Sequence, residues 1–266
     1  KNQEMKGVAF LFFSIASVVG MSTRSWTGDL TAGVSQSTQV QVHTFTRHFA
    51  NVYFLERDGR YLMIDSGLPG DCQKLLAFMD AQQIDPRLIE GLILTHAHPD
   101  HAGNAAYFQQ TFGTPIIAGA GDTTIIRKGG VDESLYPRGF QAKIIQHTIA
   151  NQVYPSFIPD TLIERYTKLL LPGWSVRVDV FHSHTPGSLV IYVENMVFVG
   201  DLLKGKTLHS QKPTWHIFMC DLAANLSDLS IVAAQENFHT WYAVHLGPLS
   251  REDVLTFINK QKKKYE

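Results

Sequence analysis

Short alternating or apolar runs, separated by Gly, Pro and Asn turns, indicate strands along much of the chain. Residues 39–46 alternate like a half-buried strand, and residues 51–55 and 61–65 flank the turn Asp58-Gly59 as a hairpin. Further strands are expected at 92–95, 115–118, 175–181, 189–193, 196–199 and 242–245. The spacing of apolar residues predicts helices over 70–83, 101–112, 221–238 and 250–263.

Each half of the chain runs through strands, a helix, a strand and a helix. This order predicts an α/β fold in which two mixed β-sheets lie face to face and are flanked by helices, a four-layer αββα sandwich. We expect this domain to span residues 38–266, after an N-terminal apolar segment at 1–37. Residues 121–171 show no strong strand pattern, and they are interpreted as a helical insert that forms a lid.

Aromatic residues supply two candidate walls for a substrate pocket. The insert has five that either line a pocket or pack its helices onto the core: Tyr136, Phe140, Tyr154, Phe157 and Tyr166. Trp215, His216 and Phe218 form the second candidate wall. His209 and His216 are interpreted as surface histidines, with contact to the substrate as the alternative.

The N-terminal segment allows two interpretations. The 15 residues from Gly7 to Met21 are apolar and follow Lys1 and Lys6. This run is shorter than the about 20 residues of a membrane-spanning helix. It has the basic start and apolar centre of a secretory signal, but no clear A-x-A cleavage site follows. Export or membrane attachment therefore stays open beside an extra element that packs on the domain or forms a homodimer contact through residues 7–21.

The composition is that of a folded globular protein, with 44% hydrophobic and 18% charged residues. The 23 basic and 24 acidic side chains nearly cancel, so no overall field attracts nucleic acid, and a small-molecule substrate is expected instead. Two cysteines, Cys72 and Cys220, are too few for a disulfide framework or a cysteine-based zinc site.

Four potential metal ligands directly follow the predicted strand 92–95. They are His96, His98, Asp100 and His101. A helix cap would explain Asp100 but would leave the three histidines without a role. Imidazole nitrogens and carboxylate oxygens are zinc ligands, so the cluster predicts a metal site.

Three further candidate ligands also follow predicted strands. His184 precedes Thr185-Pro186-Gly187, Asp201 follows Gly200, and His245 precedes Leu246-Gly247. Loops at the ends of rigid strands are where sites are commonly built. A carboxylate at Asp201 can bridge two cations, so the sequence is compatible with a two-metal centre.

The ordered motifs H-x-H-x-D-H, H-T-P-G-S, G-D and a late His, with Asp65-Ser66-Gly67 before them, resemble the metallo-β-lactamase superfamily of hydrolases. The resemblance runs from about Val40 to the C-terminus. It implies that a first metal ion is held by His96, His98 and His184, a second by Asp100, His101 and His245, and that Asp201 is shared between them. His182 does not match the ligand position. The implied cofactor is Zn²⁺, two per chain, with iron and other divalent metals as alternatives.

The implied function is hydrolysis by a hydroxide bridged by two zinc ions, which attacks the carbonyl of an ester, lactone, thioester or lactam. Asp100 is the expected catalytic residue, because it can orient the nucleophile or pass a proton to the leaving group. Alternatives from other classes are a mononuclear iron oxygenase and a non-catalytic binding protein.

Three observations bear on the substrate. The carboxylate at Asp201 resembles glyoxalase II-like and lactonase-like members more than dedicated β-lactamases. Only 21 residues follow His245, so we expect no glutathione-binding domain of the glyoxalase II type, which disfavours a glutathione thioester. Lys204 and Asn225 resemble substrate-binding residues of β-lactamases. Hydrolysis of β-lactam antibiotics therefore remains an alternative.

Overall fold

The computed structural model describes residues 39–135, 137, 139, 140, 142, 143, 152–209, 211–219, 221–235 and 238–265. The N-terminal segment 1–37, with its apolar run 7–21, lies outside the described residues, and so do Tyr136 and Cys220. No helix within the described residues is both long enough and apolar enough to cross a membrane.

Six strands form the first sheet, in the order β1-β2-β3-β4-β5-β6. Their bounds are β1 Gln41–Arg47, β2 Ala50–Arg57, β3 Arg60–Ile64, β4 Ile89–Ile93, β5 Ile116–Gly119 and β6 Thr161–Ile163. The first three strands pair antiparallel, with the predicted hairpin turn between β2 and β3, whereas β3, β4, β5 and β6 run parallel. The carboxyl ends of these parallel strands therefore meet at one edge of the sheet.

The second sheet also has six strands, in the order β14-β13-β10-β9-β8-β7. Their bounds are β7 Thr167–Leu171, β8 Trp174–Phe181, β9 Ser188–Val193, β10 Met196–Gly200, β13 Thr240–Ala243 and β14 Leu249–Ser250. Strands β10 and β13 are parallel and the other neighbours are antiparallel. A separate small ribbon pairs β11 Lys204–Gly205 with β12 Pro213–Thr214.

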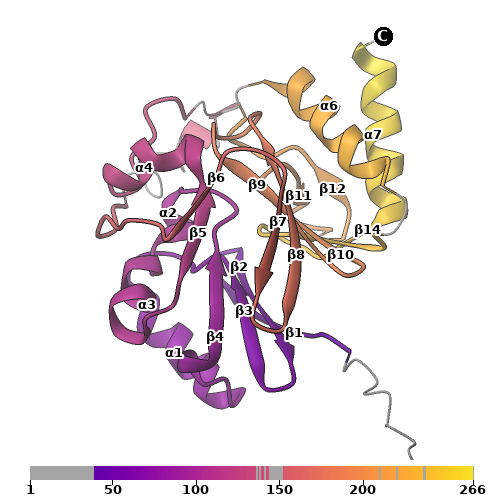
Figure 1. The fold of residues 1–266 in the computed structure, drawn as a ribbon. Coiled ribbons are helices and arrows are strands. Elements are labelled where there is room, and N and C mark those ends of the chain that lie inside the picture. Colours follow the sequence, from indigo (N-terminus) through magenta and orange to yellow (C-terminus); the bar gives the residue numbers. More distant parts are fainter. Residues whose placement is uncertain are drawn as a thin grey trace, which may run out of the picture. The chain divides into compact units, whose positions relative to one another are not determined.

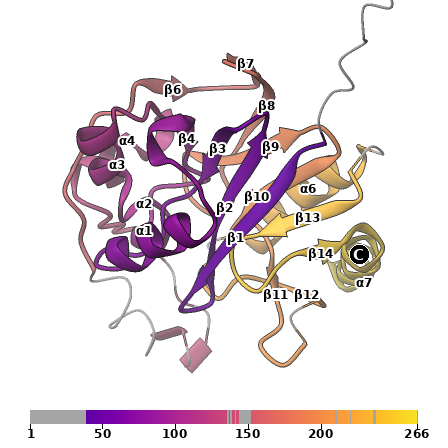
Figure 2. The ribbon, with the colours of Figure 1, turned by 90° about the horizontal axis from the view of Figure 1, so that it is seen from below.

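Helices cover the outer faces of both sheets (Figures 1 and 2). Those beside the first sheet are α1 Cys72–Ala81, α2 Pro99–Ala102, α3 Ala105–Phe112 and α4 Thr123–Arg127, with the short 3₁₀ turns η1 Pro86–Leu88 and η2 Ala120–Asp122. Those beside the second sheet are α6 Leu222–Ala233 and α7 Arg251–Tyr265. Figure 2 shows the two sheets between the two groups of helices, which confirms the predicted four-layer sandwich.

Side-chain alternation along the strands builds a core on each face of each sheet. On β2, Tyr53 points between the sheets and packs against Phe198 with ring centroids 5.4 Å apart, while the next residue, Phe54, joins Phe108 beneath the helices. Trp241 anchors a third core under α6 and α7. Because both faces of the central strands are covered, they are almost entirely apolar.

The prediction of a helical insert is wrong over residues 161–163 and 167–171, which form β6 and β7. These are the edge strands of the two sheets, held by pairing with β5 and β8. Leu162 and Leu170 are exposed there, so a buried apolar face does not mark these short segments in the sequence. Pairing with a neighbouring strand, rather than local pattern, fixes their conformation.

Near the strand ends, backbone segments of the two sheets contact each other directly at glycine residues. A Cβ on Gly119 would lie 1.9 Å from the carbonyl oxygen of Gly187, and one on Gly121 would lie 2.3 Å from that of Pro186. Only glycine allows these approaches. The segment after β5 is thereby seated on the turn that follows β8.

We expect Gly119→Ala to lower the free energy of unfolding by about 3 kcal/mol or more, because the new methyl group would force the two segments apart. Gly113→Ala is the matched control. Its Cβ would meet no heavy atom within 4 Å, so only the φ of +71° opposes alanine, at a cost of about 1 kcal/mol. Urea denaturation measures both, and equal losses would contradict the tight contact at Gly119.

Candidate metal centre

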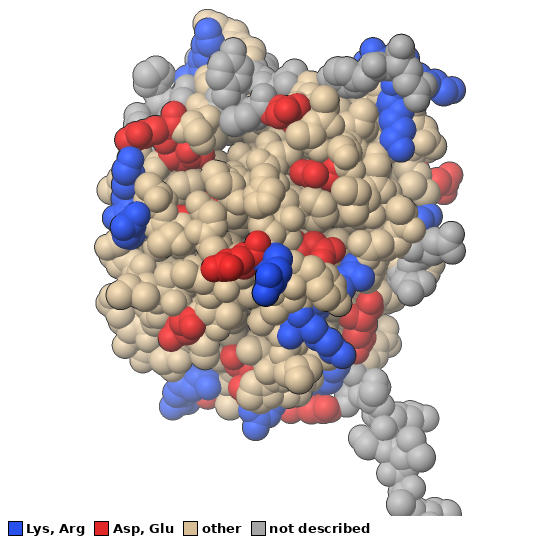
Figure 3. Space-filling view, turned by 45° about the horizontal axis from the view of Figure 1, so that its top comes forward, with Lys and Arg blue, Asp and Glu red and all other residues tan. Residues whose placement is uncertain are grey.

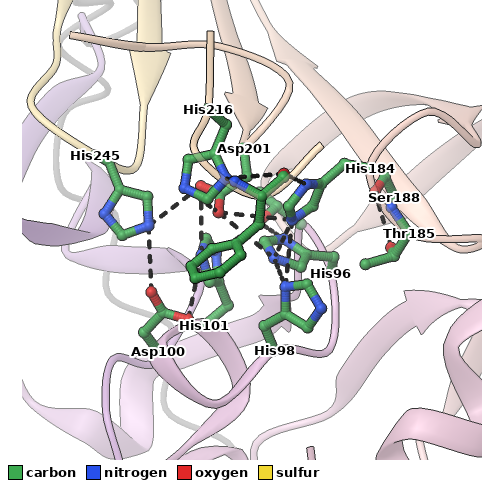
Figure 4. Close-up of polar contacts among 12 residues, drawn as sticks. His96, His98, Asp100, His101, His184, Thr185, Ser188, Asp201, His216 and His245 are labelled. Atoms are coloured by element: carbon green, nitrogen blue, oxygen red, sulfur yellow. Dashed lines mark hydrogen bonds and ion pairs between the residues drawn. The ribbon is translucent and has the colours of Figure 1, made fainter. Parts of the chain in front are cut away.

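The fold brings all seven sequence-predicted ligands into one cluster (Figure 4). By position they are His96 and His98 after β4, Asp100 and His101 in α2, His184 after β8, Asp201 after β10 and His245 after β13. The side chains of Asp100 and His245 are each 14% exposed, and the other five residues are buried. His182 is exposed and lies outside the cluster, with its Nδ1 2.6 Å from the carbonyl oxygen of Pro186.

His96, His98 and His184, the first set, aim three ring nitrogens at a common point. The Nε2 of His96 lies 3.0 Å from the Nδ1 of His98, and the Nε2 of His184 lies 3.2 Å from each of these two atoms. Nitrogen ligands about 2.0 to 2.1 Å from a tetrahedral zinc ion lie about 3.3 Å from one another. The spacing of the first set therefore matches three ligands of one ion.

Asp201 connects this first set with the second set, which consists of Asp100, His101 and His245. Its Oδ2 lies 3.6 Å from the Nε2 of His184 in the first set. Its Oδ1 lies 3.5 Å from the Nε2 of His101 and 3.4 Å from that of His245 in the second. Figure 4 shows the two sets on opposite sides of this carboxylate. Asp201 is thus placed to be shared by two cations.

The hydrogen bonds of the first set show which ring nitrogens remain to bind a metal ion. The Nε2 of His98 lies 2.9 Å from a carboxylate oxygen of Asp132, and the Nδ1 of His184 lies 2.9 Å from the carbonyl oxygen of Phe218. These oxygens accept hydrogen bonds, so the outer nitrogens donate. In a neutral ring the inner nitrogen then carries a lone pair, as a metal ligand must.

The second set is oriented in the same way. The Nδ1 of His101 lies 2.9 Å from Asp65 Oδ2, and that of His245 lies 3.1 Å from the carbonyl oxygen of Phe49. Two buried atoms at the centre, His101 Nε2 and Asp201 Oδ1, have no hydrogen-bond partner. Buried polar atoms are rarely left unpaired. Converging imidazole nitrogens and carboxylate oxygens fit zinc or another divalent transition metal.

Asp65 is the brace beneath the histidines. Its carboxylate accepts from the backbone N–H and the hydroxyl of Thr95, both at 2.7 Å, and from His101. The Thr95 hydroxyl in turn lies 3.3 Å from the Nδ1 of His96. Gly200 leaves room for this arrangement, because a Cβ there would lie 2.8 Å from that of Thr95. The Asp65-Ser66-Gly67 turn therefore serves to orient ligands.

Asp122 and Asp132 support the cluster, and sequence reasoning missed both. Asp122 is buried and accepts from the backbone N–H groups of Ala97 (2.9 Å) and Gly187 (2.7 Å) and from the hydroxyl of Thr185 (2.9 Å). It thereby ties the loop of His96 and His98 to the turn after His184. Both aspartates lie in the segment interpreted as a helical insert, where no local motif distinguishes them.

Two rings of the first set, His96 and His184, are neutral. Burial lowers the pKa of His96 well below the usual histidine value, and the neighbouring histidines lower it further. Burial also lowers the pKa of His184 well below that value, although the charge of Asp201 opposes it. Both rings are therefore unprotonated at neutral pH, as ligation requires.

The second set carries protons when no metal competes. Burial acts to lower the pKa of His101, but the carboxylates of Asp201, Asp65 and Asp100 outweigh it and raise that pKa well above the usual value. The same balance, with Asp201 and Asp100 as partners, raises the pKa of His245 to about 10. The carboxylates thus hold a positive charge between them, as a proton or as a metal ion.

A pocket of about 270 Å³ opens onto the second set. Its wall is mostly apolar and includes Phe49, Leu68, Leu135, Ile217 and Leu246. Asp100, Asp201 and His245 reach it, so a bound molecule would touch the cluster directly. On the face shown in Figure 3, the acidic and basic side chains that are drawn in colour are interspersed rather than gathered by sign.

The predicted aromatic lid does not line this pocket among the described residues. Tyr154 and Phe157 belong to the core beneath the first sheet, and the Tyr154 hydroxyl donates to the carbonyl of Ala97 at 2.7 Å. Phe140 and Tyr166 are exposed. The segment contributes instead three other residues, Gly130, Asp132 and Leu135.

The two predicted substrate-binding residues differ in placement. Lys204 lines the pocket, where burial lowers its pKa against the opposing charge of Asp201, and its Nζ donates a long 3.3 Å hydrogen bond to the carbonyl of Gly205. Asn225 lies in α6, fully buried and outside the pocket, with its Nδ2 donating to the hydroxyl of Ser183 at 3.2 Å. The substrate-binding role predicted for Asn225 is therefore not supported, because its side chain is enclosed.

The interpretation of His216 as a surface histidine is wrong. His216 is only 6% exposed, and its Nε2 lies 3.2 Å from Asp201 Oδ2. Burial lowers its pKa to about 4. Of the second candidate wall, His216 and Phe218 line the pocket as predicted, together with Ile217, whereas Trp215 packs against Phe257. His209 is exposed, as expected.

Comparisons with known proteins identify relatives of this fold and cluster. The sequence model of the metallo-β-lactamase superfamily matches residues 45–230, more than half of the chain. The hydroxyacylglutathione hydrolase of Anaeromyxobacter dehalogenans is 25% identical over 57% of this chain and 45% of its own length. The probable metallo-hydrolase YqgX of Bacillus subtilis is 28% identical over 58% of this chain and 66% of its own length. The chain thus spans about half to two thirds of these curated relatives.

Solved structures share the architecture at low sequence identity. The Cronobacter sakazakii metallo-β-lactamase with the HARLDQ motif superposes with a TM-score of 0.63 at 13% identity, covering 84% of this chain and 89% of that one. BJP-1, a subclass B3 metallo-β-lactamase of Bradyrhizobium japonicum, gives a TM-score of 0.61 at 13% identity, covering 85% and 89%. At such identities the likeness shows the fold.

Metal binding to the second set is expected to release protons, because His101 and His245 hold them at neutral pH. The apparent affinity of this set for Zn²⁺ should rise with pH up to the pKa of His245, by about tenfold per pH unit for each displaced proton. Calorimetric titration in two buffers of different ionisation enthalpy counts the protons. His245→Ala should release fewer, and binding without proton release would contradict the assignment.

Asp132→Asn should weaken metal binding by about 10- to 100-fold, because the carboxylate that orients His98 is lost. The hydrogen bonds from His98 and Ser134 outweigh burial and hold the pKa of Asp132 at about 2, so the native group is ionised. Asp80→Asn, on the exposed face of α1, is the control. A competition titration with a chelating dye measures both affinities, and equal affinities would exclude an orienting role.

Proposed function

Because the chain belongs to the metallo-β-lactamase superfamily, we propose that it is a zinc hydrolase that acts on a carbonyl compound, an ester, lactone, thioester or lactam. The proposal is carried by Asp201, whose two oxygens face two different sets of ligand atoms. Burial would raise the pKa of Asp201, but His216, His245 and His101 outweigh it and keep that pKa well below its usual range, so the carboxylate is ionised. This arrangement supports two metal ions rather than one.

Two zinc ions, when bound, would supply a hydroxide nucleophile near neutral pH and polarise the substrate carbonyl. His96, His98 and His184 would hold one ion and Asp100, His101 and His245 the other, with Asp201 between them. The outer hydrogen bonds to Asp132, Phe218, Asp65 and Phe49 fix the rings before any ion or substrate arrives. The protein therefore supplies a preorganised donor set.

Asp100 is the residue we assign to proton handling. It lines the pocket, and its Oδ2 lies 3.2 Å from the Nε2 of His245. Burial would raise its pKa, but the charge of His101 and the hydrogen bond from His245 keep it well below the usual range. An ionised carboxylate at this edge can accept a proton from the nucleophile and deliver it to the leaving group.

The pocket favours a substrate with an apolar body and a negatively charged group. Its wall is mostly apolar, and Lys204 supplies a cation near Asp201. A β-lactam with its carboxylate at Lys204 is the second candidate, although the burial of Asn225 removes one of the two residues that suggested it. Two curated relatives are named hydroxyacylglutathione hydrolases, so that substrate also belongs among the candidates.

The test joins elemental analysis of the purified protein to a panel of substrates. We expect about two zinc ions per chain and turnover of one carbonyl class among nitrocefin, simple lactones, carboxylic esters and hydroxyacylglutathione. A phosphodiester serves as the negative comparison. One iron ion per chain would favour an oxygenase, and metal without turnover of any panel member would favour a binding protein.

Asp201→Ala should lower metal content at both sets and reduce hydrolysis by at least about a hundredfold, because several kcal/mol of transition-state stabilisation depend on the ions. Metal content by mass spectrometry and the rate on the best panel substrate are measured together. Asp80→Ala should change neither. An Asp201→Ala protein with two ions and an unchanged rate would overturn the shared-ligand assignment.

A further inference from the structure

His216 contacts the cluster through Asp201, and the superfamily pattern gives it no role. It follows β12, in a segment with no metal-ligand motif. Its ring stacks on His245, with centroids 5.2 Å apart and an interplanar angle of 22°, and stands at 88° to that of His184, also 5.2 Å away. Figure 4 shows it directly beside Asp201.

One carbonyl group orients both His184 and His216. The oxygen of Phe218 lies 2.9 Å from the Nδ1 of His184 and 3.1 Å from the Nδ1 of His216. Each ring then presents its Nε2 to the same carboxylate oxygen, Asp201 Oδ2, at 3.6 Å for His184 and 3.2 Å for His216. The outer partner of His216 is thus the same atom that orients an expected ligand.

In one of the two neutral tautomers of His216, a lone pair faces a lone pair. A neutral His216 that donates from Nδ1 to Phe218 has an unprotonated Nε2, which faces an oxygen that also only accepts. Two buried acceptors at 3.2 Å need a cation between them or beside both. The other tautomer, in which Nδ1 accepts from the N–H of Phe218 and Nε2 donates to Asp201, uses the longer contact of 3.3 Å.

We propose that His216 is an eighth metal ligand, which forms with His184 and Asp201 a third set that overlaps the first. The ligand atoms of these three buried residues all lie within 4.8 Å of one another. A metal ion on the first-set side of Asp201 can then draw on His216 in addition to His96, His98 and His184. This inference concerns metal binding alone and holds whichever bond the protein cleaves.

In the test, the metal-free protein is titrated with Co²⁺ and the visible absorption of the bound ion is recorded. This absorption reports the number and geometry of the ligands. His216→Ala should weaken the tightest Co²⁺ binding by at least about tenfold, because losing a residue that only orients a ligand already costs about that much. The shape of the absorption spectrum should change as well. His216→Phe, which keeps a ring in the pocket wall, should do the same. His48→Ala, at another pocket-lining histidine outside the cluster, should do neither.

A second pair isolates the third set. His96→Ala should still bind a Co²⁺ ion on the first-set side of Asp201 through His184, Asp201 and His216, whereas the double variant His96→Ala/His216→Ala should lose that ion and keep only the one held by the second set. Circular dichroism of each metal-free variant confirms folding. An affinity and spectrum unchanged by His216→Phe, or equal binding by the single and double variants, would overturn the proposal and leave His216 as a hydrogen-bond donor to Asp201. Because no turnover is measured, a failed hydrolase assay does not affect the result.

Discussion

The concentration of buried lone pairs around Asp201 is the constraint on which the rest of the site depends. Histidine rings on both sides donate hydrogen bonds from their outer N–H groups to fixed oxygens. Their inner nitrogens therefore face one another and the two carboxylate oxygens of Asp201. In a buried setting this arrangement is stable only around positive charge. A metal ion satisfies it, and a proton on His101 or His245 satisfies part of it when metal is absent.

Hydrogen bonds and close backbone contacts fix the loops that carry these groups, in addition to the side chains themselves. Asp65 and Asp122 each accept three hydrogen bonds and link segments that are far apart in the sequence. Gly119, Gly187 and Gly200 allow backbone to approach backbone or Thr95 at distances that any side chain would block. Since the loops follow strands packed in a dense double sheet, the ligand atoms are positioned before a metal binds.

The two sets of the cluster differ in both charge and exposure. His96, His98 and His184 are buried, and burial keeps His96 and His184 neutral. Asp100 and His245 are partly exposed and border the pocket. The pocket is therefore lined by Asp100, Asp201 and His245 together with His98 of the first set, whereas His96 and His184 do not line it.

The sequence by itself determined the sandwich, its main strands and helices, and the six residues that meet around Asp201 as well as Asp201 itself. It could do so because the ligands sit in short local motifs directly after apolar strands, and strand ends converge in this type of fold. Tertiary structure alone decided the rest. His216, Asp122 and Asp132 carry no local motif, since their partners lie on distant segments. Asn225 is enclosed although its motif suggested otherwise, and β6 and β7 exist through pairing with β5 and β8, because edge strands need no buried face to be held.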